Sequence, residues 1–75
     1  MTLPPALHTL LVDFEPAIRE IALRLDGLER LEAANREYEF VMAWTPPQHQ
    51  DEAHDLMLRA LVRHGIVQED APRAH

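Results

Sequence analysis

The stretch Tyr38-Glu39-Phe40-Val41-Met42-Ala43-Trp44 decides the fold that we predict for this chain. Its side chains fall into two alternating sets: Tyr38, Phe40, Met42 and Trp44 on one side, and Glu39, Val41 and Ala43 on the other. Aromatic and β-branched residues with a period of two are typical of a β-strand. A strand needs a paired neighbour, so we expect residues 28–33 to form the preceding strand, with a turn around Asn35.

Segments with helical spacing lie on both sides of this hairpin. Apolar side chains in residues 18–25 form one stripe, which predicts a helix that stops at Asp26-Gly27. We expect Gly27 to have a positive φ, with Leu28 packing back onto Leu23 as in a Schellman ending. In residues 53–61, apolar side chains at i, i+3, i+4 and i+7 predict a second helix, which we expect Gly65 to end.

Strands are also expected at both ends of the domain. Alternation in residues 10–14 predicts a first strand, and residues 66–67 are expected to form a short last one. The predicted fold is therefore α+β, with two helices on one face of a four-stranded antiparallel sheet. We expect the domain to cover residues 7–68, between an N-terminal extension at residues 1–6 and a flexible tail at residues 69–75.

In this order of elements the chain resembles small ferredoxin-like domains of the heavy-metal-associated and ACT type. The matching segments are residues 18–25, then Gly27-Leu28 opening the second strand, residues 56–61, and Gly65-Ile66 before the last strand. The resemblance implies a ferredoxin-like βαββαβ fold. The chain departs from the metal-binding family because it has no cysteine, which excludes a Cys-x-x-Cys site for copper or zinc. It also lacks the glycine-containing turn of ligand-binding ACT domains.

An all-α helical hairpin is the alternative fold. A heptad seam could be formed by Ile18, Ile21, Leu25 and Leu28. Residues 28–37 are rich in good helix formers, and Thr45-Pro46-Pro47 could join two long helices. Against this alternative stand Gly27 in mid-helix and the strand-like pattern that ends at Trp44.

Composition limits the classes of function. The chain has 75 residues, no cysteine and a net charge of −6, with its seven cationic side chains scattered and all of them arginine. A nucleic-acid-binding surface needs clustered cations, so we expect no nucleic-acid partner. No apolar run reaches the length of a membrane span, and no secretory signal is present, so we expect no membrane contact and a cytoplasmic location. Helical spacing pairs three carboxylates with arginines: Glu15 with Arg19, Glu20 with Arg24, and Asp55 with Arg59.

No convincing catalytic, cofactor-binding or metal site emerges from the sequence. Asp51, His54 and Asp55 would share one helical neighbourhood, but they lack a clear third strong ligand. His64 is expected to serve the C-terminal end of a helix, which favours a positive or hydrogen-bonding group. Trp44 is expected to cover the core rather than to stack on a ligand. We therefore expect a protein that is not an enzyme and has no cofactor.

The strongest functional indication is a second apolar surface. If the helices cover one face of the predicted sheet, then Leu11, Val41 and Ala43 point away from it and form an open apolar patch, which is typical of an association surface. We therefore expect a small acidic association module, a homodimer or the partner of another protein. The alternatives are a small-ligand sensor of the ACT type, with Trp44 lining its site, and an enzyme that uses the region of His54.

Overall fold

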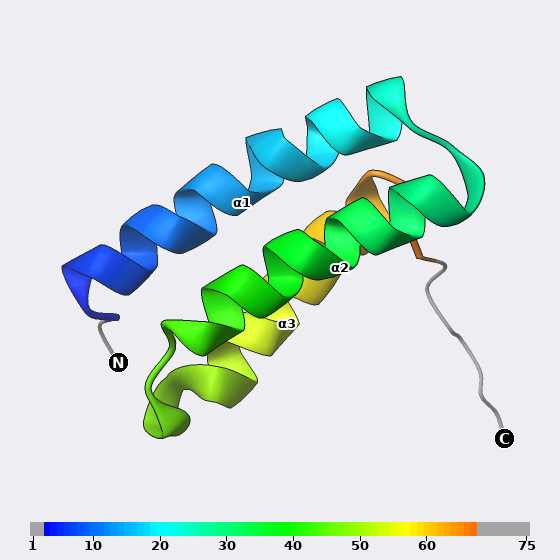
Figure 1. Cartoon of the computed structure of the whole chain (residues 1–75). Coiled ribbons are helices and arrows are strands. Elements are labelled where there is room, and N and C mark those ends of the chain that lie inside the picture. The colour runs from blue at the N-terminus through cyan, green and yellow to red at the C-terminus, as the bar shows by residue number, and fades with distance from the viewer. Residues whose placement is uncertain (1–2, 68–75) are drawn as a thin grey trace, which may run out of the picture.

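The computed structural model describes residues 3–67 and consists of helices connected by short turns (Figure 1). The elements are α1 (Pro5–Arg24), α2 (Gly27–Ala43), a short 3-10 helix η1 (Pro47–His49), and α3 (Gln50–Arg63). Successive long helices run in opposite directions, so α1 and α3 point the same way and α2 runs against both. All three long helices contact one another. The core lies between them.

The predicted α+β fold is wrong, because the described residues 3–67 contain no strand and no sheet. The two strands expected around Asn35 are instead one continuous helix, α2. Its buried side chains are Ala33, Ala34 and Val41, with Tyr38 and Met42 packed at their edge. The buried side chains of this segment therefore follow the helical period, and the alternation by two does not indicate a strand. The resemblance to ferredoxin-like domains is therefore wrong as well, because that fold requires a sheet.

The first strand is also absent, because residues 10–14 lie in the middle of α1. The side chains that face the core include a seam whose members follow in steps of four and three residues: Leu7, Leu11, Phe14, Ile18 and Ile21. This seam runs almost the full length of the helix and begins well before residue 18. Pro16 lies inside α1, where its ring removes one backbone hydrogen bond without ending the helix. Burial along the seam offsets that loss.

Two glycines with positive φ mark helix boundaries. Gly27 has φ +60°, as predicted, but it opens α2 after an extended pair, Leu25 and Asp26, and Leu28 and Leu23 are both exposed. The Schellman arrangement occurs at the end of α3 instead, where Gly65 has φ +75° and the Ile66 N–H donates to the Leu61 carbonyl over 2.9 Å.

The second predicted helix is confirmed as α3, with Ala53, Met57 and Ala60 buried along one face. Gly65 ends it as expected, but Ile66 folds back into the core rather than starting a strand. The all-α alternative is thus correct in class. It is wrong in detail because the chain turns twice, at residues 25–26 and at residues 44–46, and so forms three long helices.

The predicted N-terminal boundary at residue 7 lies inside α1, which begins at Pro5. The tail predicted for residues 69–75 lies outside the described residues. Within residues 3–67, no helix combines the length and the apolar character that crossing a membrane requires.

Candidate functional site

The three residues predicted to form an association surface do not lie together on an open face. Val41 is 2% exposed and belongs to the core, Leu11 packs against that core, and Ala43 is exposed. In a strand Val41 and Ala43 would share a face, whereas in a helix they lie about 200° apart. The predicted open-sheet patch is therefore replaced by other surfaces.

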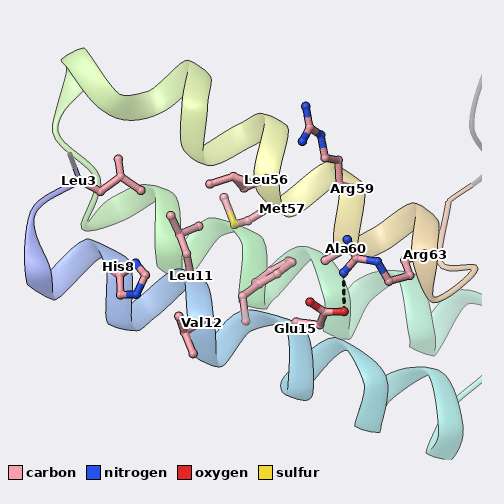
Figure 2. A pocket seen from close by; sticks show the side chains of 11 residues that line it. Leu3, His8, Leu11, Val12, Glu15, Leu56, Met57, Arg59, Ala60 and Arg63 are labelled. Atoms are coloured by element: carbon pink, nitrogen blue, oxygen red, sulfur yellow. Dashed lines mark hydrogen bonds and ion pairs between the residues drawn. The ribbon is translucent and has the colours of Figure 1, made fainter. Parts of the chain in front are cut away.

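An apolar groove lies between α1 and α3 (Figure 2). Its cavity volume is about 410 Å³, and Leu11 and Leu56 project into it from the two helices, with Leu3 at one end. The remaining lining side chains are His8, Val12, Phe14, Glu15, Met57, Arg59, Ala60 and Arg63. The groove is open to solvent rather than enclosed.

The rim of this groove is more basic than the rest of the chain. Arg59 and Arg63 lie on the α3 side and His8 on the α1 side, while Glu15 is the one carboxylate among the lining residues. The whole chain carries a net charge of −6. Arg59 forms an exposed i,i+4 ion pair with Asp55 at 2.9 Å. An exposed pair of this kind contributes little to the free energy of unfolding, and it leaves most of the five N–H donors of Arg59 available.

Glu15 connects α1 to the C-terminal end of α3. The Glu15 Oε2 atom accepts a hydrogen bond from Arg63 and lies 3.2 Å from His64 Nε2. His64 is the C-cap residue of α3. The hydrogen bonds from Arg63 and His64 hold the pKa of Glu15 below its ordinary value of 4.5. The predicted pair with Arg19 is replaced by this cross-helix cluster, whereas Glu20–Arg24 at 2.7 Å and Asp55–Arg59 at 2.9 Å form as expected. His64 lies at the C-terminal end of α3 as expected, and its side chain pairs with Glu15.

We predict that Glu15→Gln lowers stability at neutral pH, and that the difference from the natural protein disappears in acid. A carboxyl whose folded pKa is depressed contributes stability that is present above its unfolded pKa and is lost as pH falls through the folded pKa. The difference in unfolding midpoint should therefore hold from pH 7 to about 5 and shrink below about 4.5, the ordinary value. Urea unfolding at several pH values measures it.

The control is Glu32→Gln, at an exposed position of α2 with no ion pair among the described residues. A difference for Glu15→Gln that stays constant down to pH 3 would contradict the role of the charge.

A second groove lies between α2 and α3 and has a cavity volume of about 440 Å³. Leu31, Ala34, Leu61, Ile66 and Val67 supply its apolar lining. Its polar groups are Asn35 and a pair formed by the Tyr38 hydroxyl and His54 Nδ1, 2.8 Å apart with the two rings edge to face. The side chain of His54, considered above as a metal ligand, is thus engaged by Tyr38.

No three metal-ligating side chains come together anywhere in residues 3–67. Asp51 and Asp55 are exposed on α3, and only their neighbour His54 takes part in a defined side-chain pair between helices. His49 is buried in η1, and its Nδ1 has no hydrogen-bond partner within the described part of the chain. His49 and His54 therefore occupy separate environments.

Sequence reasoning missed an exposed aromatic pair at the end of α2. Phe40 is 55% exposed and Trp44 is 67% exposed, so Trp44 does not cover the core. Phe40 lies in the last turn of α2 and Trp44 is the C-cap residue of that helix, so the two side chains are about one helical turn apart. The helical period of Ala34, Tyr38 and Val41 could have identified this pair, because it places residues 40 and 44 away from the core. The alternation by two had instead placed Phe40 and Trp44 on the same side as Tyr38.

Comparison with protein-family models, with characterised proteins and with solved structures finds no significant match for this chain. A function for this chain is therefore indicated by the surfaces of residues 3–67.

Proposed function

We propose that this protein is a non-enzymatic association module that binds an amphipathic helix with acidic flanking residues in the groove between α1 and α3. The observation that carries the proposal is the combination of an apolar floor, including Leu11 and Leu56, with the arginines Arg59 and Arg63 on one rim. Helix-in-groove recognition uses this kind of furrow, and side chains at i, i+3 and i+7 of the bound helix fill it.

Exposed aliphatic side chains make this groove favourable to cover. Val12 is 55% exposed and Leu56 is 39% exposed, although both lie beside a well-packed core. Covering them removes apolar surface from water, which is the main driving force of association. The rim then selects the partner, because the guanidinium N–H groups that the pairs with Asp55 and Glu15 leave unused can bind carboxylates in defined geometry.

The proposal predicts a preference that the total charge of the protein would not produce. Two synthetic amphipathic helices with the same leucine face, one flanked by Glu and one by Lys, are labelled with fluorescein and titrated with the protein. A chain of net charge −6 attracts the Lys-flanked peptide overall. We expect the Glu-flanked peptide to bind at least about tenfold more tightly, which corresponds to about 1.4 kcal/mol. Fluorescence anisotropy measures both affinities.

Matched variants of α1 locate the binding site. Val12→Glu adds a carboxylate to the groove and should weaken binding of the Glu-flanked peptide by about tenfold or more. Leu23→Glu makes the same change at a more exposed position of the same helix, outside the groove, and should leave affinity unchanged. Preference for the Lys-flanked peptide, or equal losses in the two variants, would refute binding in this groove.

Small-ligand binding is the second candidate, and the α2/α3 groove favours it. That groove offers an apolar lining with three convergent polar side chains, Asn35, Tyr38 and His54, which is a common composition of small-molecule sites. Binding of a small apolar ligand with one hydrogen-bonding group should shift the NMR signals of His54. The affinity for that ligand should fall in Tyr38→Phe and stay unchanged in Val12→Glu.

A further inference from the structure

The exposed aromatic pair Phe40 and Trp44 has the character of the segment that the α1/α3 groove is proposed to bind. Large aromatic side chains concentrate the binding energy of protein interfaces, and tryptophan is among the residues most enriched there. Both side chains are more than half exposed, and they project from the C-terminal end of an amphipathic helix.

Carboxylates outnumber cations beside Phe40, although exposed Arg36 lies one helical turn before it on α2. The shallow depression beside Phe40 is lined by Leu10, Asp13, Phe14, Glu37 and Val41, a set with two carboxylates and no cation. Glu39 is exposed one position from Phe40. The last turn of α2 has no basic residue, so the partial negative charge of its helix terminus is not compensated within that turn. An arginine-bearing surface is the complementary partner for this end of α2.

The α1/α3 groove supplies that surface in the same chain. Its rim carries Arg59 and Arg63, and its floor is apolar. Within one molecule the two surfaces border different flanks of α1, since the groove faces α3 and the depression at Phe40 faces α2. One copy can therefore present its aromatic pair while its groove stays free to receive another.

We infer that the occupant of the groove is a second copy of this chain, which inserts Phe40 and Trp44 between α1 and α3. This inference rests on the proposed association function and names its partner. Reciprocal insertion gives a closed dimer with two identical contacts, which doubles the area buried by one contact and leaves no surface for further growth. A stable interface covers about 800 Å² per partner, an area more readily reached by two contacts than by one.

Sedimentation equilibrium on the full chain and two variants tests the exchange. The aromatic variant combines Phe40→Ala with Trp44→Ala, and the groove variant is Val12→Glu; all changed positions are exposed, and circular dichroism verifies that each variant is helical. We expect the natural chain to be dimeric at high concentration and each variant to dissociate at least about tenfold more readily. Leu28→Ala, an exposed change at the other end of α2, should stay dimeric.

Mixing the two variants distinguishes insertion into the groove from contact between aromatic pairs. The groove variant retains its aromatics and the aromatic variant retains its groove, so an equimolar mixture should form a heterodimer through one intact contact. Trp44 is the only tryptophan, and its emission in the groove variant should shift to shorter wavelength when the aromatic variant is added. A groove variant that remains fully dimeric alone, or masses that grow beyond a dimer, would overturn the inference.

A natural chain that stays monomeric at high concentration would also overturn self-recognition. The peptide titration is then the independent measurement, because binding of the Glu-flanked helix that Val12→Glu weakens would retain the groove as a site for another protein.

Discussion

Val41→Glu is expected to unfold this protein, whereas Ala43→Glu is expected to leave it folded. Val41 is 2% exposed in the core, and a carboxylate there would be buried without a partner. An uncompensated buried charge costs about 3 to 5 kcal/mol. Small domains have little stability in reserve, so this loss is comparable to the whole free energy of unfolding. Circular dichroism at 222 nm, with urea titration, measures the helical signal.

Ala43→Glu is the matched control, because it introduces the same side chain two positions away on the exposed side of α2. A carboxylate at the C-terminal end of a helix costs about 0.3 to 1 kcal/mol, which is far less than the loss expected for Val41→Glu. The pair also tests the secondary structure directly. In a strand the two positions would face the same side, so the two substitutions would change stability alike. In a helix they face different sides, so only Val41→Glu should cause a large loss of stability. Equal responses would argue against α2.

Ile18→Ala is expected to have the second largest effect. Ile18 is 0% exposed at the centre of α1, in the core cluster that also contains Met57 of α3 and Val41 of α2. Truncating a buried isoleucine removes transfer free energy and leaves a cavity, which together cost about 2 to 5 kcal/mol. The urea midpoint should fall accordingly, and the free energy of unfolding follows by linear extrapolation.

Leu23→Ala provides the comparison within the same helix, because Leu23 is 76% exposed and alanine is the better helix former. Its free energy of unfolding should change by less than about 0.5 kcal/mol. If Leu23→Ala were as destabilising as Ile18→Ala, the assignment of the core face of α1 would be incorrect.

The sequence by itself determined features that depend on a few neighbouring residues. Gly27 was expected at positive φ and has it, because glycine has no Cβ to oppose the left-handed region. The helix over residues 53–61 and its end at Gly65 were likewise predictable from spacing. The Glu20–Arg24 and Asp55–Arg59 pairs formed as expected, since i,i+4 neighbours meet on any helix.

Only the tertiary structure decided the state of residues 38–44. This run satisfies a period of two and a helical period together, and its local preference for strand is weak compared with packing. Packing Val41 against α1 and α3 requires the helix, and the same rotation exposes Phe40 and Trp44. Glu15 meets Arg63 and His64 for a similar reason, because contacts over 48 and 49 positions exist only after the helices have assembled.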